Sequence, residues 1–163
     1  MQTPSEQSYR EIPLTLGQVA IVDAADYDWL MLSKWQAVWD KKKQDYYARK
    51  SDDGEYKSMH RQILGLKHGD PREGDHWDGK GLHNWRANLR ICTRGQNKRN
   101  APKRKDNTSG YKGVDFHNGA YRARINRDGK SIYLGTRSTA RAAHFELYVP
   151  AAKEHHQEFA RLE

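Results

Sequence analysis

The N-terminal half of the chain contains short stretches in which apolar and polar residues alternate, the pattern of half-buried β-strands. Residues 12–22 predict two such strands around a turn at Gly17-Gln18. Segments 35–39 and 46–49 are rich in Trp and Tyr and alternate like the strands of a hairpin, with the lysines of 41–43 near its turn. We expect these aromatic side chains in the core rather than on a binding surface.

Helical spacing is predicted at two places in the same half. Residues 26–30 suggest one helical turn. Residues 58–66 predict an amphipathic helix, because their apolar side chains fall on one face, and Ser58 suits its N-cap. Residues 68–74, with Gly, Pro and Asp, should end that helix.

A change of composition near residue 100 predicts a domain boundary. Residues 101–107 combine a proline with charged residues and have no apolar side chain beyond alanine. Segments of this kind connect domains, because few contacts cross them. The sequence therefore predicts a first domain over 1–100, a basic linker over 101–107 and a second domain over 108–163.

The second domain is predicted to begin with a three-stranded antiparallel sheet. Its strands are expected over 110–114, 120–125 and 131–135. The dipeptides Asn118-Gly119 and Asp128-Gly129 lie between them and are strong hairpin-turn signals.

A helix should follow this sheet and pack on it. We expect it to begin at Ser138 or Thr139 and to run to about His156. Pro150 lies inside this range and removes an intrahelical hydrogen bond, so a kink or two shorter helices are expected. The predicted fold class is therefore α+β, with strands in the N-terminal half and a C-terminal three-stranded antiparallel sheet packed on a helix.

Charge points to a polyanionic partner. The 163 residues carry a net charge of +8, and the segment 79–105 contains nine Lys or Arg and no Asp or Glu. Such a stretch is typical of a phosphate-binding surface, and nucleic acid is the commonest polyanion in the cytoplasm. The alternative is a solvated charged face. No apolar stretch approaches the roughly 18 residues of a membrane span, and no signal-peptide pattern is seen, so we expect a cytoplasmic protein without a membrane partner.

Cys92 is the single cysteine of the chain. It cannot form an internal disulfide, and it excludes zinc sites that need several thiolates. Because it lies in the apolar run 89–92, we expect a buried thiol.

Candidate chemistry is concentrated in residues 74–100. Asp75 and His76 are adjacent, and at the end of a strand their side chains would point to opposite faces. Glycines around residue 80 allow a tight turn, residues 88–92 can return as a second strand, and residues 94–100 can form a short polar helix. Asn97 on that helix could reach back toward Asp75.

These residue types suit phosphodiester hydrolysis. A histidine with a near-neutral pKa can take a proton from the attacking water. A divalent cation can stabilise the charge on the phosphate and on the departing oxygen. Carboxylate and amide oxygens favour magnesium.

The same region resembles the HNH homing endonucleases of phages and mobile elements, which have a ββα-metal fold. An Asp-His pair, an Asn-Leu pair twelve residues beyond the histidine and an Asn nine residues further form a specific pattern. The residues that support the resemblance are Met59-His60-Arg61, Asp75-His76, Gly79, Leu82, Asn84, Asn88-Leu89-Arg90 and Asn97.

The resemblance implies a role for each motif residue. His76 would be the general base, and Asp75 and Asn97 would be the ligands of a divalent metal, most simply Mg²⁺. Asn88 would complete the catalytic centre by pinning the loop between the two strands through hydrogen bonds.

At five further positions, either the role of the residue is undecided or the residue type differs from the one usual in the family. His60 and Arg61 match a family motif, either as structural contacts under the site or as phosphate contacts. Gly74 and Trp77 stand where aliphatic residues are usual. His83 stands where an acid is common, and it is either a second titrating group or a loop residue.

Residues 107–163 resemble the ethylene-response-factor (APETALA-type) DNA-binding domain. The matching segments are 109–114, 121–125, 134–135 and 158–162. The resemblance implies a sheet that lies in the major groove of DNA. Alternation would place Arg122 and Arg124 toward DNA, opposite the helix.

The resulting hypothesis is a site-specific, metal-dependent DNA endonuclease whose partner is double-stranded DNA. A monomer would nick and a homodimer could cut both strands; a phage-encoded protein would act in the host cytoplasm. The alternatives are a non-catalytic DNA-binding protein with a degenerate nuclease scaffold, and an RNA-directed protein. The expected nucleic-acid contacts are Arg86, Arg90, Arg94, Lys98, Arg99, Lys112, Arg122, Arg124 and Lys130.

Overall fold

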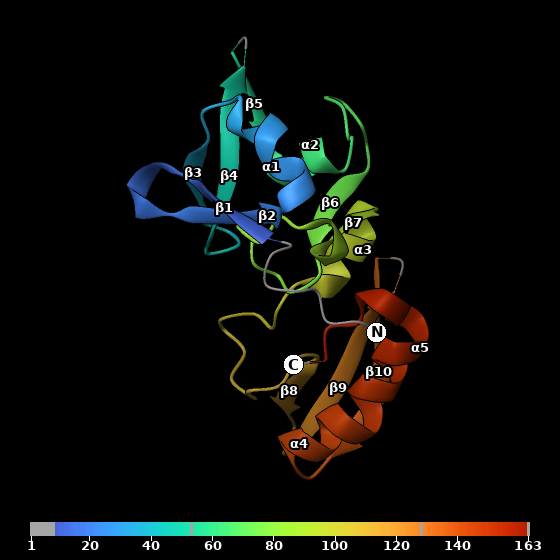
Figure 1. Ribbon diagram of the computed structural model, residues 1–163. Helices are drawn as coiled ribbons and strands as arrows, with labels where there is room; N and C mark the ends of the chain where they lie inside the picture. Colours follow the sequence, from blue (N-terminus) through green and yellow to red (C-terminus); the bar gives the residue numbers. More distant parts are fainter. Residues whose placement is uncertain (1–8, 53, 128, 163) are drawn as a thin grey trace. The chain divides into compact units, whose positions relative to one another are not determined.

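The computed structural model describes residues 9–52, 54–127 and 129–162. It is an α+β protein with small antiparallel sheets, as the sequence predicts, and it divides into two compact units, residues 1–94 and 95–163 (Figure 1). The segment 101–107 therefore groups with the second unit. Within the described residues, no helix is both long and apolar enough to cross a bilayer.

The first unit opens with the predicted hairpin. Strand β1 (Tyr9–Pro13) pairs antiparallel with β2 (Val19–Asp23), and a 3-10 turn (Thr15–Gly17) joins them. Gly17 has a φ of 66°, which glycine adopts without strain. Helix α1 (Ala24–Met31) follows, around the helical turn expected at residues 26–30.

A three-stranded sheet comes next, in the order β3-β4-β5. Strands β3 (Gln36–Asp40) and β4 (Asp45–Asp52) form the predicted hairpin, and the Asp40 carboxylate accepts backbone hydrogen bonds from Lys42 and Lys43 in its turn. Strand β5 (Glu55–Ser58) was not expected from the sequence.

Helix α2 (Met59–Ile63) is shorter than the predicted helix over 58–66. Gly65 adopts a φ of 68° directly after it and turns the chain away, so Leu66 is buried from a loop and not from the helix. Ser58 does occupy the N-cap position, but its side chain makes no capping hydrogen bond.

The motif region forms the elements that the sequence predicts. Strand β6 (Glu73–His76) pairs antiparallel with β7 (Leu89–Cys92), and a 3-10 turn (Arg86–Asn88) leads into β7. Helix α3 (Arg94–Asn100) follows in the chain.

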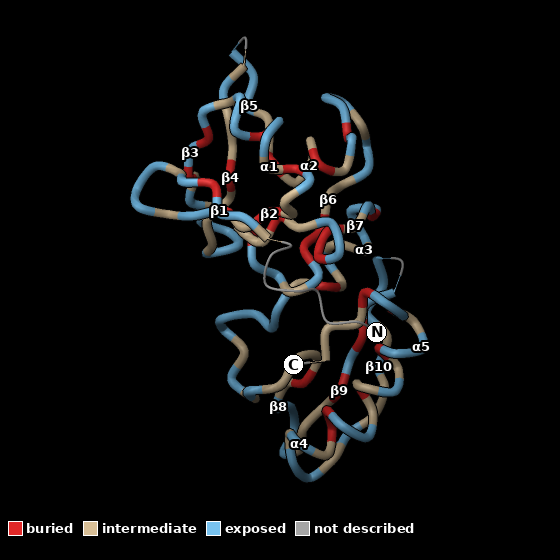
Figure 2. The backbone as a smooth tube through the Cα atoms, in the orientation of Figure 1, coloured by how far each residue is buried: buried red, intermediate tan, exposed pale blue. Residues whose placement is uncertain are grey.

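One apolar cluster holds the first unit together. The indole of Trp35 is buried in it and donates a hydrogen bond to the carbonyl of Leu30 at 2.8 Å, which satisfies its only polar atom. Cys92 is buried as expected. Figure 2 colours the buried stretches of the backbone red. The buried members of the cluster are Ile12, Ala20, Val22, Leu30, Trp35, Ala48, Met59, Ile63 and Leu89.

The second unit contains a three-stranded sheet in the order β10-β9-β8. Its strands are β8 (Val114–His117), β9 (Ala120–Arg127) and β10 (Lys130–Arg137). Asn118-Gly119 makes the predicted turn, with φ values of 49° and 79°, whereas Asp128 of the second predicted turn lies outside the described residues.

Strand β8 begins at Val114, so the strand expected over 110–114 was wrong. Gly110 and Gly113 both have left-handed φ values, 79° and 76°, which extended strands do not allow. A Cβ at Gly113 would overlap the ring of Tyr148, so glycine is required at this turn by packing as well as by conformation.

The C-terminal helical region is broken into pieces, as Pro150 predicts. Thr139 caps helix α4 (Ala140–Ala142) through its hydroxyl; a π-helical stretch (Ala143–Tyr148) and helix α5 (Val149–His156) follow. The wider π turn precedes the proline, where the missing N–H and the ring would otherwise disturb a regular α-turn. A 3-10 turn (Gln157–Phe159) ends the region.

These helices cover one face of the β8–β10 sheet. The residues buried between them are Val114, Ala123, Ile125, Ala143, Tyr148 and Ala152. Both ring nitrogens of buried His144 lie within hydrogen-bond distance of carbonyls, those of Lys112 (3.0 Å) and Leu162 (2.9 Å). His144 thus connects the helical region to the segment before β8 and to the C-terminal segment.

Candidate functional site

The pairing of β6 with β7 places His76 in a buried position next to the loop that joins them. Its Nε2 lies 3.2 Å from Oδ1 of Asn84, which is fully buried. The Asn84 side-chain amide donates to the Gly81 carbonyl at 3.4 Å, and its backbone N–H donates to the Ile21 carbonyl at 2.7 Å. With the Asn84 amide oriented in this way, Oδ1 accepts from His76, and the neutral imidazole carries its proton on Nε2.

Two aromatic rings lie against His76. The centroid of the His60 ring is 4.9 Å away and that of Tyr47 is 5.8 Å away, both in edge-to-face geometry. Burial lowers the pKa of His76 and lowers that of His60 to about 3, while it raises the pKa of Tyr47 to about 12. All three side chains are therefore uncharged near pH 7.

Gly74 is explained by its contact with His60. A Cβ at residue 74 would lie 2.6 Å from Cδ2 of His60 and 3.1 Å from a methyl carbon of Leu64. An aliphatic side chain there, usual in the resembled family, would displace the His60 ring. Gly74 thus allows His60 to pack directly beneath His76.

Asp75 is paired with Arg90 across the two strands. The residues are direct partners in the β6–β7 register, and Oδ2 of Asp75 lies 2.8 Å from both Nε and Nη2 of Arg90. The guanidinium also lies over the Trp77 ring, 4.5 Å from its centroid. Both partners of the ion pair are largely buried, so this contact is screened little by solvent.

Asn88 makes hydrogen bonds across the loop between the strands. Its Oδ1 accepts from the backbone N–H of Asp78 at 3.1 Å, and its Nδ2 donates to Oδ1 of Asp78 at 3.0 Å and to the carbonyl of His83 at 2.8 Å. Its own carbonyl accepts from the Trp77 N–H. These are the loop-spanning contacts that the motif predicts for Asn88.

His83 lies in the same loop with its own carboxylate partner. Its Nδ1 is 2.6 Å from Oδ2 of Asp78, and its ring packs 4.8 Å from that of Trp85. The His83 side chain is 24% exposed, so it forms an Asp–His pair at the edge of the loop.

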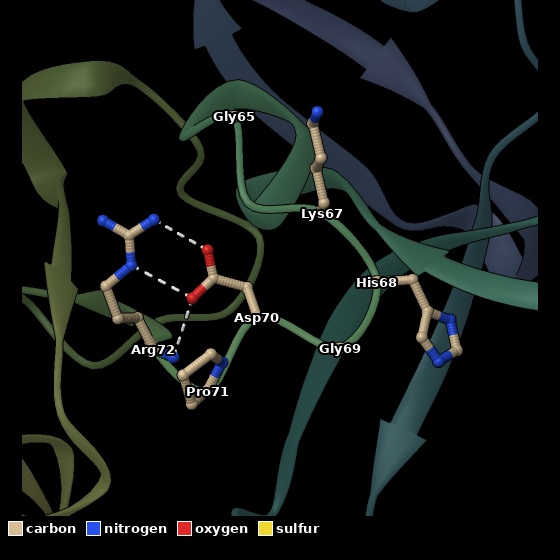
Figure 3. A pocket seen from close by; sticks show the side chains of 7 residues that line it. All are labelled: Gly65, Lys67, His68, Gly69, Asp70, Pro71 and Arg72. Carbon is tan, nitrogen blue, oxygen red and sulfur yellow. Dashed lines mark hydrogen bonds and ion pairs between the residues drawn. The ribbon is translucent and has the colours of Figure 1, made fainter.

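Arg61 makes structural contacts within the loop after α2. Its guanidinium donates to the carbonyls of Arg72 (2.9 Å), Lys67 (3.0 Å) and Asp70 (3.4 Å). Figure 3 shows the shallow pocket over this loop, lined by residues 65 and 67–72, with the ion pair between Asp70 and Arg72 drawn at its rim. Arg61 therefore holds the loop, and His60 lies under His76.

The two expected metal ligands belong to different units. Asp75 is in the first unit, and Asn97 is on α3 in the second, so their pairing stays a prediction from the motif. Across residues 9–52, 54–127 and 129–162, no group of three or more His, Cys, Asp or Glu is placed to hold a metal. Magnesium needs few protein ligands, because waters and substrate phosphates complete its shell, and the oxygen donors of Asp75 and Asn97 fit it chemically.

Several of the predicted DNA contacts are engaged inside their own unit. Arg86 forms a two-pronged ion pair with Asp26, at 2.8 and 2.7 Å. Lys112 is half-buried, and its ammonium donates to the carbonyls of Arg99 and Ala101 at 2.7 and 2.6 Å. Burial lowers the pKa of Lys112 to about 8. The exposed cations of the predicted set are Arg86, Arg94, Lys98, Arg124 and Lys130, and of these Arg86 is held by its ion pair with Asp26.

The open face of the β8–β10 sheet carries the two predicted arginines. Ala123 and Ile125 are buried under the helices, so Arg122 and Arg124 project from the other face, as alternation requires. Asp115 on the neighbouring strand lies within ion-pair distance of both arginines.

Sequence reasoning gave no role to Asn84, Tyr47 or Asp115. Asn84 belongs to the residues that support the family resemblance, so a signal for it existed. Asp115 reaches Arg122 through the pairing of β8 with β9, and Tyr47 reaches His76 through packing between two different sheets. Neither relationship can be read from the sequence. Comparison of the chain with protein-family models, curated proteins and solved structures finds no match to any of them.

Proposed function

We propose that this protein is a metal-dependent, site-specific DNA endonuclease of the HNH type. In this proposal the first unit hydrolyses the phosphodiester bond and the second unit contributes DNA binding. The observation that supports it most strongly is the state of His76, which is neutral through burial and held by Asn84 in one tautomer. A general base must be unprotonated at the working pH and must be held in a fixed orientation.

His76 acts as the base through Nδ1. With the proton on Nε2, the ring lone pair lies on Nδ1, which takes one proton from a water molecule. The resulting hydroxide attacks phosphorus, the bond from phosphorus to the 3′ oxygen breaks, and that oxygen takes a proton from solvent. The products are a 5′-phosphate and a 3′-hydroxyl, as the family resemblance implies. Oδ1 of Asn84 accepts from Nε2 throughout and stabilises the imidazolium that forms.

Asp75 and Asn97 would hold the magnesium ion. When bound, the metal supplies charge stabilisation for the phosphate and the leaving oxygen. Arg90 forms an ion pair with the Asp75 carboxylate and fixes its orientation, and Trp77 lies against the guanidinium. The Asn88 hydrogen bonds keep the connecting loop, which contains Asn84, in one conformation.

The Asp75–Arg90 ion pair also favours a second candidate, a DNA-binding protein whose nuclease scaffold is inactive. A guanidinium that already neutralises the carboxylate lowers its attraction for a cation. The two candidates differ in one property, the ability to break a phosphodiester bond.

Incubation of the full chain with supercoiled plasmid in magnesium separates these candidates. The proposal predicts nicked or linear plasmid in magnesium and none in chelator, with DNA binding retained in both. Asp75→Ala should abolish cutting. Asp70→Ala, which removes the ion pair between Asp70 and the exposed Arg72 in the same unit, is the matched control and should cut normally. Plasmid that is bound but stays supercoiled in magnesium would favour the inactive scaffold.

A further inference from the structure

Asp115 lies between two arginines on the open face of the second unit's sheet. It is the direct register partner of Arg122, and its carboxylate accepts from Arg122 Nε at 3.3 Å and from Nη2 at 2.6 Å. Its Oδ1 also lies 3.5 Å from Nε of Arg124. The neighbouring Val114 is buried in the core, so alternation directs Asp115 to the same face as the arginines.

The contact with Asp115 occupies one edge of the Arg122 guanidinium, and a second edge remains able to donate hydrogen bonds. Nε and Nη2 form the side edge, which the carboxylate takes in two-pronged geometry. Nη1 makes no hydrogen bond with any described residue, so the end of the guanidinium, Nη1 together with the second hydrogen of Nη2, presents two parallel donors. The side chain of Arg122 is only 22% exposed, and it is therefore held in one orientation rather than moving in solvent.

Two parallel donors in a fixed orientation match the O6 and N7 acceptors of guanine in the major groove. A phosphate is a less suitable partner for this edge of Arg122. The adjacent carboxylate repels phosphate oxygens, and phosphate binding does not require two donors in a fixed orientation. Arg124 has a single, longer contact with Asp115 and is 45% exposed, so it lacks the same restraint.

We propose that Asp115 is a specificity-determining residue that fixes Arg122 as a reader of one guanine in duplex DNA. The inference rests on the proposed DNA-binding function of the second unit. Asp115 touches no base in this arrangement. It acts by limiting the orientations of Arg122, so its removal should lower discrimination between bases without lowering the general affinity for DNA.

Selection of binding sites from a randomised duplex pool tests this, with the full chain in chelator so that no DNA is cut. The variants are Asp115→Asn and Arg122→Ala. Asp106→Asn is the matched control, because Asp106 forms the same two-pronged pair with an arginine, Arg104, in the same unit, at exposed positions. Thermal unfolding confirms that each variant folds.

The proposal predicts that wild type and Asp106→Asn select the same guanine at one base pair. Arg122→Ala and Asp115→Asn should both lose that preference, by about tenfold, at that same pair. Asp115→Asn should bind scrambled duplex at least as tightly as wild type, since a negative charge has been removed.

Three results would overturn the inference. If Asp115→Asn keeps the guanine preference while Arg122→Ala loses it, Arg122 reads DNA without help from Asp115. If Asp115→Asn only raises affinity for all sequences, as Asp106→Asn does, the carboxylate acts through charge alone. If wild type binds no duplex, the proposed DNA-binding function fails together with this inference.

Discussion

His76 and Asn84 are joined by a buried hydrogen bond of 3.2 Å that decides which nitrogen of the imidazole carries the proton. Asn84 is itself fixed at both its amide and its backbone, by the Gly81 and Ile21 carbonyls. The tautomer of the proposed base is thus set by the loop between β6 and β7 and by its contact with β2.

The pH dependence of cleavage should report the environment of His76. Burial lowers the pKa of His76 below its usual value of 6.5, so the base is unprotonated above that pH and the rate should fall only below it. Asn84→Asp places a carboxylate at Nε2 and should move the acidic limb of kcat/KM to higher pH by about one unit or more. Asn118→Asp, the same change in an exposed turn of the second unit, should leave the profile unchanged. Superimposable profiles for wild type and Asn84→Asp would contradict the assigned tautomer.

Acid should destabilise the first unit through His60. Burial first, and then the neighbouring His76, lower its pKa from 6.5 to about 3. Between these values the unfolded chain binds a proton that the folded chain does not, so stability is lost as pH falls from 6.5 toward 3, by about 1.4 kcal/mol per pH unit from this group. Urea unfolding at several pH values should show this slope for wild type and a shallower one for His60→Gln. His68→Gln, at an exposed histidine, serves as the control and should keep the wild-type slope.

Gly74→Ala should destabilise the first unit by forcing His60 away from its position. The added methyl group would overlap Cδ2 of His60, and overpacking of this kind costs about 1–3 kcal/mol. A double-mutant cycle with His60→Ala measures the coupling by chemical unfolding. The smaller residue makes room for the methyl group, so the double variant should recover most of the loss caused by Gly74→Ala. Additive losses would show that the two positions do not interact.

Lys112 is predicted to stabilise the second unit rather than to bind phosphate. Lys112→Met leaves the carbonyls of Arg99 and Ala101 without their donor and should cost about 1–3 kcal/mol of unfolding free energy. The salt dependence of DNA binding should stay as in wild type. Lys130→Met at an exposed position should do the opposite, with normal stability and a slope of log K against log salt reduced by about 1 if Lys130 contacts a phosphate. A reduced slope for Lys112→Met would show that Lys112 contacts phosphate and would contradict its structural role.

The sequence predicted elements where local signals were strong. The Asn118-Gly119 turn, the strand ending at His76 and the helix over 94–100 all follow from short-range patterns. The end of α2 and the start of β8 were not predicted correctly. Both boundaries are determined by glycines with left-handed φ values, at positions 65, 110 and 113, and these backbone angles cannot be read from the sequence.

The candidate site was predictable only in its named motif residues. His76 and Asn88 could be singled out by spacing, but the Asp75–Arg90 pair depends on strand register. The low pKa of His60 depends on its burial and on its contact with His76, which are set by tertiary packing. Lys112 shows most clearly why a residue's role could not be predicted from the sequence. A lysine in a basic chain suggests phosphate binding, and only tertiary packing places its ammonium against two carbonyls.

The most direct test of the proposed function is the cleavage rate of His76→Ala compared with that of His68→Ala, on supercoiled plasmid in magnesium at pH 7.5. Loss of the base should lower the rate by roughly 100-fold or more and leave DNA affinity nearly unchanged. His68→Ala, which removes an exposed histidine of the same unit, should cut at the wild-type rate. A His76→Ala protein that binds DNA and cuts as fast as wild type would contradict the account.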